Sequence, residues 1–154
     1  MTRDTALAAA AALLAEGRLQ AVLARRIAIP SESQDPARAP VLQAYLDDEL
    51  VPALQRLGFT HRVLPNSEAG GPPFLIATRT EPGAALRVLS YGHGDVVRGQ
   101  AGQWRDGRDP WTLSIDGDRW YGRGTADNKG QHSINLLALE AVLQARGGRL
   151  GFDL

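Results

Sequence analysis

Apolar residues recur at helical spacing in three parts of the chain. The first part covers about residues 4–27, where an alanine-rich run leads into further apolar positions three and four residues apart. Gly17 lowers helix propensity inside this part, so the helix can break there. The second part covers about residues 40–57, where Pro52 predicts a kink or a division into two pieces. The third part covers about residues 128–145.

Short apolar runs bounded by glycine and proline predict β-strands in the middle of the chain. They cover residues 59–64, 74–78 and 86–91. We expect the third run, which contains Leu86, Val88 and Leu89, to be a buried strand. The dipeptide Asp116-Gly117 predicts a two-residue turn between two further strands, and residues 150–154 indicate the start of another.

The order of these elements predicts the fold class. Two helical parts come first, a group of strands follows, and the chain then returns to a helix and a strand. Such an order is typical of a layered α/β domain, and 154 residues are enough for one domain with its own core.

Composition narrows the classes of function. Seventeen basic residues balance seventeen acidic ones, so the net charge points neither to nucleic acid nor to a membrane surface as a partner. The chain has no cysteine, which excludes disulfides, iron–sulfur clusters and thiolate zinc sites. Any metal ion must therefore be held by His, Asp and Glu, a ligand set that suits catalytic zinc, cobalt or manganese.

The alanine-rich run at residues 6–15 is the only segment that resembles a targeting signal. Asp4 and Glu16 flank it, and the helical pattern continues beyond it, so an amphipathic helix fits better than a signal peptide. No stretch approaches the roughly 20 apolar residues of a membrane span. We expect a cytoplasmic protein that does not associate with a membrane.

A histidine and a carboxylate follow the third predicted strand. His93 and Asp95 are two residues apart, and positions i and i+2 of an extended chain face the same side. A carboxylate in that place can orient an imidazole and make it a better metal ligand. Gly92 and Gly94 would leave the site open to a metal or a substrate. The alternative is an ordinary hydrogen-bonded histidine at the end of a strand.

A second carboxylate stands at the predicted start of the last helix. Asp127 ends the pattern Gly122-x-Gly124-x-x-Asp127. One interpretation is a helix N-cap that accepts backbone N–H groups. The other is a metal bridge, because a carboxylate has two oxygens and can join two cations about 3.5–4 Å apart.

These motifs together resemble the M20 family of metallopeptidases, which includes carboxypeptidases, dipeptidases, aminoacylases and deacylases of amino-acid derivatives. The resemblance rests on Gly-His-Gly-Asp-Val-Val at residues 92–97, Trp104, Pro-Trp at 110–111, and Gly-Asp-Arg-Trp-Tyr-Gly-Arg-Gly-Thr-Ala-Asp-Asn-Lys-Gly at 117–130. It is continuous from about Leu86 onward and looser upstream, where Ile29-Pro30-Ser31 and Leu57-Gly58-Phe59 also look like family features.

The resemblance implies a zinc-exopeptidase-like α/β fold, with helices on both faces of a mixed sheet. It also implies two divalent metal ions, with zinc first and cobalt or manganese as alternatives. His93 would be a ligand of one ion, Asp127 would bridge both through a cis Asp127–Asn128 peptide, and Asp95 would be the catalytic-site carboxylate that orients His93. A metal-activated water would then cleave the amide bond of a peptide or an N-acyl amino acid.

Members of the family continue with a Glu-Glu pair that supplies the general base and a ligand. They also have a later acidic ligand, a later His ligand, and a small domain usually used for dimerisation. Residues 1–154 contain none of these. We therefore expect an N-terminal portion of a catalytic domain that is inactive alone and whose longer parent is a homodimer. A non-catalytic remnant or partner-binding module remains the alternative, as does coincidental hydrogen bonding of the His and Asp residues.

Other polar and aromatic residues receive structural interpretations. We expect His132, on the last helix, to be a hydrogen-bonded or surface residue and not a ligand. Lys129 and Arg123 could meet a substrate carboxylate or be structural, and the sequence leaves both interpretations open. The three tryptophans are interpreted as packing residues.

Overall fold

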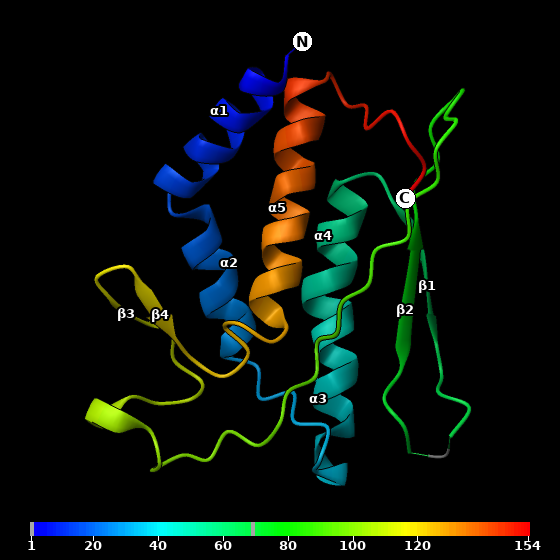
Figure 1. Ribbon diagram of the computed structural model, residues 1–154. Helices are drawn as coiled ribbons and strands as arrows, with labels where there is room; N and C mark the ends of the chain where they lie inside the picture. Colours follow the sequence, from blue (N-terminus) through cyan, green and yellow to red (C-terminus); the bar gives the residue numbers. More distant parts are fainter. Residues whose placement is uncertain (1, 69) are drawn as a thin grey trace.

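The computed structural model describes residues 2–68 and 70–154, which form a helical layer flanked by two small β-hairpins (Figure 1). The elements are α1 Arg3–Ala15, α2 Arg18–Ile27, η1 Pro36–Arg38, α3 Ala39–Ala44, η2 Tyr45–Leu50, α4 Val51–Arg56, β1 Thr60–Leu64, β2 Phe74–Thr78, η3 Arg105–Gly107, β3 Ser114–Asp116, β4 Arg119–Tyr121 and α5 Lys129–Ala145. The chain thus has the expected α/β composition.

The first helical part breaks at Gly17. This residue has φ +73°, in the left-handed region that glycine adopts without steric cost, and it separates α1 from α2. The two helices are bent by 57° relative to each other. Within residues 2–68 and 70–154 no single helix has the length and apolar composition of a membrane span, and α1 and α2 meet that test only as this bent pair.

The second helical part is a continuous rod whose middle is a π-helical segment. η2 connects α3 to α4, and Pro52 stands in the first turn of α4. Because proline has no N–H to donate, the irregular hydrogen bonding falls in the turn that precedes it. Pro52 therefore changes the helix type locally and does not divide the rod. Gly58, with φ +78°, ends it as a C-terminal cap residue.

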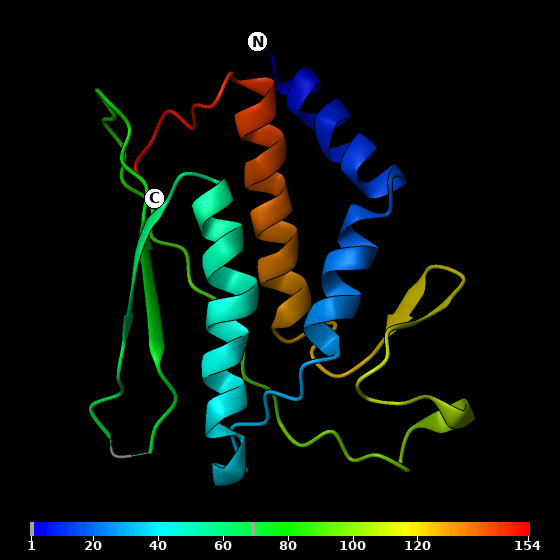
Figure 2. The same cartoon turned by 180° about the vertical axis from the view of Figure 1, so that it is seen from behind.

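Helix α5 lies at the centre of the helical layer. In both views it runs between the rod formed by α3, η2 and α4 and the pair α1 and α2 (Figures 1 and 2). α5 contacts α1 and α2. The buried apolar side chains include Leu13, Leu23, Ile27, Leu42, Tyr45, Ala53, Leu57, Phe59, Val96, Pro110, Ala141, Ala145 and Leu150. Most of this core therefore lies between helices.

Two antiparallel hairpins supply the named strands. β1 pairs with β2 from Thr60 opposite Thr78 to Leu64 opposite Phe74. β3 pairs with β4, and Gly117 makes the turn between them with φ +60°. The β3–β4 hairpin confirms the turn predicted at Asp116-Gly117, which is a local signal. β1 and β2 confirm two predicted strands, but the sequence analysis did not predict that they pair with each other.

The expectation of a buried strand at residues 86–91 is wrong for this structure. The segment makes only an isolated parallel bridge from Arg87 to Asp153, and Leu89 and Tyr91 are 95% and 82% exposed. Residues 150–154 likewise form no strand, although Leu154 and Arg79 exchange two backbone hydrogen bonds of 2.8 and 2.9 Å. A strand forms only where another segment pairs with it over several residues, and a local apolar pattern cannot provide that partner.

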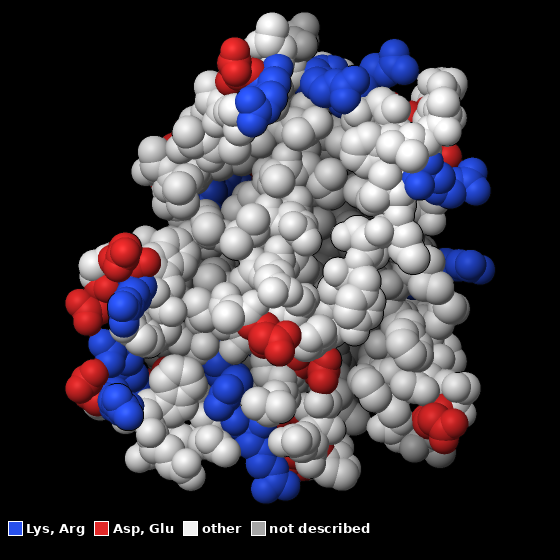
Figure 3. Space-filling view, viewed as in Figure 1, with Lys and Arg blue, Asp and Glu red and all other residues white. Residues whose placement is uncertain are grey.

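The surface of the chain is large for its mass. It measures 9470 Å² for 16.5 kDa, whereas a compact monomer of this mass exposes about 7,600 Å². Figure 3 shows one face with a largely uncharged centre and charged groups of both signs toward the edges. The exposed side chains include large apolar ones, such as Leu86, Leu89 and Tyr91.

Candidate active site

The three residues singled out by the sequence meet in space. His93 Nδ1 lies 3.1 Å from Asp95 Oδ1, and His93 Nε2 lies 3.0 Å from Asp127 Oδ1. The imidazole thus lies between two carboxylates that are 32 residues apart in the sequence. Asp127 is open to solvent with 81% of its side chain exposed, whereas His93 and Asp95 are one-third exposed.

Residues 31–33 hold the segment that carries His93 and Asp95. Val96 N donates to Ser31 O at 2.8 Å, and Ser33 N donates to Val96 O at 3.1 Å. These bonds form a parallel bridge between Glu32 and Val96, and Val96 is buried. The segment is extended here although it is not part of a sheet. His93 and Asp95, two residues apart, therefore face the same side, as expected for positions i and i+2 of an extended chain.

A glycine-rich turn places Asp127 at the start of α5. The Asp127–Asn128 peptide bond is cis, as the resemblance implied. The residue that precedes the first turn of α5 is Asn128, and Asp127 makes no capping hydrogen bond to the helix. The N-cap interpretation of Asp127 is therefore wrong, and its carboxylate is free to face His93.

Gly92 and Gly94 have a different role from the one expected. A Cβ on Gly94 would lie 2.4 Å from Cδ1 of Tyr45, and a Cβ on Gly92 would lie 3.1 Å from Cβ of His132. These glycines allow the backbone to pack against buried side chains, and they do not serve to open the site.

Lys129 and His132 are buried in the wall behind the site. Lys129 Nζ donates to the carbonyls of Arg26 and Ile29 at 2.8 and 2.6 Å and lies 4.9 Å from the ring centre of Tyr45. Burial lowers the pKa of Lys129 to about 7 and that of His132 to about 3. The hydrogen bonds of Lys129 go to the backbone, which favours the structural interpretation of this residue. His132 makes hydrogen bonds to Tyr45 and Asn128, so the expectation of a hydrogen-bonded histidine is confirmed.

The remaining aromatic and basic residues also pack. Trp104 Nε1 donates to Gly99 O at 2.8 Å. Arg123 Cζ lies over the Trp104 ring, 5.5 Å from its centre. A Cβ on Gly99 would lie 2.4 Å from Cζ2 of Trp111. These contacts agree with the interpretation of Trp104 and Trp111 as packing residues.

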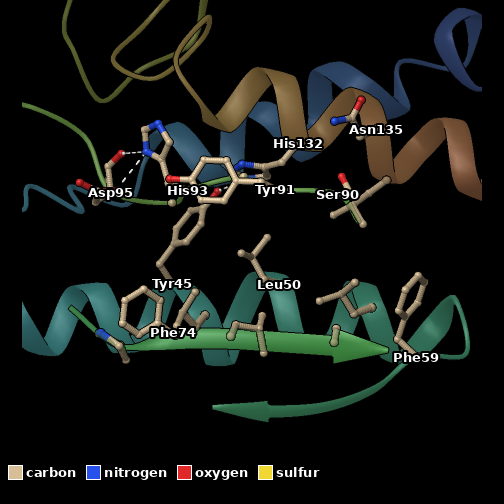
Figure 4. A pocket seen from close by; sticks show the side chains of 18 of the residues that line it. Tyr45, Leu50, Phe59, Phe74, Ser90, Tyr91, His93, Asp95, His132 and Asn135 are labelled. Carbon is tan, nitrogen blue, oxygen red and sulfur yellow. Dashed lines mark hydrogen bonds and ion pairs between the residues drawn. The ribbon is translucent and has the colours of Figure 1, made fainter. Parts of the chain in front are cut away.

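A cavity of about 450 Å³ opens beside His93 and Asp95. Its walls come from the α3–α4 rod, from β2, from α5 and from residues 88–95. Figure 4 shows His93 and Asp95 at one end and Phe59 toward the other, with Tyr45, Leu50 and Phe74 along the wall. The candidate site therefore lies at the polar end of a mainly apolar hollow.

Comparison with known proteins shows which family has residues His93, Asp95 and Asp127 in this arrangement along the sequence. The sequence profile of peptidase family M20/M25/M40 matches residues 89–152, a range that contains His93, Asp95 and Asp127. Acetylornithine deacetylase of Proteus mirabilis is 34% identical over 116 residues, which are 75% of this chain and 29% of that protein. The chain belongs to the M20 peptidase family.

Other M20 relatives and solved structures agree. Cysteinylglycine-S-conjugate dipeptidase of Corynebacterium striatum is 40% identical over 78 residues, 50% of this chain and 17% of that protein. The dipeptidase Dug1p of Saccharomyces cerevisiae has a TM-score of 0.82 at 22% identity, with 98% of this chain and 33% of that one covered. Human carnosine dipeptidase 1 has a TM-score of 0.78 at 25% identity, with 96% and 33% covered. The chain spans about a third or less of each relative.

M20 peptidases are metal-dependent, and the His93–Asp127 pair fits a metal ion. Two ligands of a tetrahedral zinc, with bonds of 2.0–2.2 Å, lie about 3.3–3.6 Å apart, so the 3.0 Å between His93 Nε2 and Asp127 Oδ1 would have to widen by a few tenths of an ångström. Imidazole and carboxylate are also ligands that zinc, cobalt and manganese accept. Among the described residues no group of three or more His, Asp or Glu is placed to hold an ion. The pair is therefore a partial ligand set.

Sequence reasoning missed two residues next to this pair, Tyr45 and Asn128. Tyr45 is 1% exposed and Asn128 is 9% exposed. A signal was present for each: Tyr45 puts a polar group into a helix otherwise patterned with leucine, and Asn128 directly follows Asp127. Neither signal predicts a role, because the sequence does not show which atom each polar group hydrogen-bonds to: His132 for Tyr45, and the backbone N–H of His93 for Asn128.

Proposed function

We propose that the protein containing these residues is a metal-dependent hydrolase that cleaves the amide bond of a peptide or an N-acyl amino acid. The observation that carries this proposal is the array Asp95–His93–Asp127, in which one carboxylate contacts each ring nitrogen of the imidazole. The names of the relatives support it, because a deacetylase of acetylornithine and a dipeptidase both hydrolyse an amide bond.

Each residue has a chemical role in this proposal. With a metal ion bound, Asp95 would accept a hydrogen bond from His93 Nδ1–H, which lies 3.1 Å away, and the lone pair of His93 Nε2 would be left for the ion. His93 and Asp127 would hold one divalent ion, and the exposed carboxylate of Asp127 would also help to hold a second. When bound, such ions, zinc by preference and cobalt or manganese otherwise, would supply the lowered pKa of a nucleophilic water and the polarisation of the scissile carbonyl.

Residues 1–154 form the N-terminal portion of the catalytic domain in this proposal, and the rest of the protein supplies further ligands and the general base. A catalytic zinc normally has three protein ligands, and the array provides two. The isolated 154 residues should therefore bind metal weakly and be inactive. Homodimerisation of the longer protein and a cytoplasmic location belong to the same proposal.

The decisive experiment uses the native gene product purified from its source. We expect Zn²⁺-dependent hydrolysis of acetylornithine, of a dipeptide, or of both.

We expect Asp95→Asn to weaken Zn²⁺ binding about 10–100-fold, because a carboxylate that orients a ligating histidine has that effect. Asp118→Asn, at an exposed aspartate in the β3–β4 turn, is the matched control. No hydrolysis with Zn²⁺, Co²⁺ or Mn²⁺, or a His93→Ala variant with unchanged Zn²⁺ affinity, would sink the proposal.

A partner-binding module is the second candidate, favoured by the exposed apolar side chains at residues 86–91. Leu86, Leu89 and Tyr91 are 60%, 95% and 82% exposed. A native product of 16.5 kDa, isolated with a second protein and with no hydrolytic activity, would favour this candidate over the enzyme.

A further inference from the structure

A chain of buried hydrogen bonds ends at the backbone of His93. Tyr45 Oη lies 2.8 Å from His132 Nε2, and His132 Nδ1 lies 3.3 Å from Asn128 Oδ1. The same Asn128 oxygen accepts the backbone N–H of His93 at 3.1 Å. Tyr45 is 1% exposed, and His132 and Asn128 are each 9% exposed. The chain therefore joins η2 and α5 to His93 inside the molecule.

The backbone N–H of His93 determines where the protons lie. A backbone N–H only donates, so the Asn128 atom that it meets is the carbonyl oxygen. His132 Nδ1 faces the same oxygen and must carry a hydrogen. Burial, together with the nearby positive charges of Arg26 and Lys129, lowers the pKa of His132 to about 3, so its ring is neutral. His132 Nε2 then has a free lone pair and accepts the hydroxyl hydrogen of Tyr45.

The same side chains fix the backbone on both sides of His93. The Tyr45 ring packs against Gly94, and His132 packs against Gly92, with room for no larger residue at Gly94. Ser31 Oγ, which is fully buried, donates to Gly94 O at 2.6 Å. The Asn128 amide nitrogen donates in turn to Gln131 Oε1, which keeps its oxygen turned toward His93. The position of the His93 backbone is therefore determined by residues that do not touch Asp95 or Asp127 through their side chains.

We propose that Tyr45, His132 and Asn128 are positioning residues that hold His93 in the orientation in which its ring meets Asp95 and Asp127. The inference rests on the proposed function, in which His93 is a metal ligand. His93 is one-third exposed, so packing around its own ring is too loose to fix it. A metal ligand must be held within a fraction of an ångström, and rigid support behind it provides this.

Paired substitutions of His132 in the 154-residue chain test the inference without a metal. Gln can donate to Asn128 and accept from Tyr45 as the neutral imidazole does, whereas Leu can do neither. We expect His132→Leu to speed hydrogen exchange of the His93 amide about tenfold or more relative to amides in the middle of α5. His132→Gln should stay within about threefold of the unchanged chain. Tyr45→Phe keeps the ring on Gly94 and removes only the hydroxyl, so it serves if His132→Leu does not fold.

Titration with Co²⁺ alone gives the second readout. We expect His132→Leu to weaken Co²⁺ binding about tenfold, the effect of losing support behind a ligand, and His132→Gln to restore it. Asn135→Ala, at an exposed residue of the same helix that also lines the cavity, should change neither readout.

The outcomes separate this inference from the proposed function. Equal acceleration of all amides, or an unchanged His93 amide in both His132→Leu and Tyr45→Phe, would overturn the positioning role. A His93→Ala variant that binds Co²⁺ as well as the unchanged chain would instead overturn the metal site. The His93 amide would still report on the positioning residues in that case.

Discussion

At the residue scale, the hydrogen bonds behind His93 depend on the protonation state of the buried His132 ring. The sequence singled out His93, Asp95 and Asp127 by residue type and spacing, and the structure brings all three within hydrogen-bond distance. Their roles as ligands stay predictions. Burial lowers the pKa of His132 well below its ordinary value, into a range that titrates at acid pH.

The pH dependence of folding should report on His132. Its pKa falls from 6.5 to about 3 on folding, because burial disfavours the charged ring. The unfolded chain therefore binds more protons than the folded chain between these values, and stability must fall as pH drops from about 6.5 toward 3. One proton gives a slope of at most about 1.4 kcal/mol per pH unit.

Urea unfolding in the presence of a chelator, at several pH values from 7 to 4, measures this slope. We expect His132→Gln to flatten it, because Gln keeps the hydrogen bonds and does not titrate. His61→Gln, at a half-buried residue of β1 outside this network, is the control. Identical pH dependence in the unchanged chain and His132→Gln would contradict the prediction.

At the element scale, the junction between the glycine-rich turn and α5 sets the place of Asp127. The first turn of α5 folds back onto the preceding turn, and Gly130 N donates to Gly124 O at 3.1 Å. A Cβ on Gly130 would lie 1.8 Å from the backbone oxygen of Thr125. No side-chain rotation can relieve such a contact, so this turn and the helix can meet only at a glycine.

We expect Gly130→Ala to lower the free energy of unfolding by about 3 kcal/mol, the upper part of the range for overpacking, because two backbone segments must separate. Chemical denaturation measures the loss. Gly17→Ala is the matched control: a Cβ there meets no atom within 4 Å, and only the cost of positive φ remains, about 1–2 kcal/mol. A smaller loss for Gly130→Ala than for Gly17→Ala would mean that the junction is not tightly packed.

At the scale of the whole molecule, the uncovered apolar surface should control association. The chain exposes roughly a quarter more surface than a compact monomer of its mass, and Leu89 is almost fully exposed beside the cavity. Contiguous exposed apolar surface of this kind favours contact with another protein surface.

Leu89→Asp should reduce self-association of the 154-residue chain and change its free energy of unfolding by less than about 0.5 kcal/mol, as is usual for exposed positions. Sedimentation velocity over a range of concentrations measures the association. Leu14→Asp makes the same change at a leucine on α1 that is 58% exposed, and it should have less effect. Equal effects of the two substitutions would show that residues 86–91 are not a preferred contact surface.

The sequence by itself determined the local elements and the chemistry of the candidate site. Helical spacing, Gly17, Gly58 and the Asp116-Gly117 turn act over a few residues, so each sets a boundary that the structure reproduces. The motifs around His93 and Asp127 were sufficient to indicate the family, because residue types at fixed spacing are properties of the sequence.

Only the tertiary structure decided which of these elements pair and which polar atoms meet. The run at residues 86–91 has a strand pattern, but a strand also requires neighbours, and here it pairs only through Arg87 and Asp153. Tyr45 and His132 are 87 residues apart in the sequence, and their hydrogen bond exists because the fold brings these two side chains, from η2 and α5, together. Local preference is encoded residue by residue, whereas contacts between distant residues depend on how complete elements pack, and this is why the support of His93 could not be predicted from the sequence.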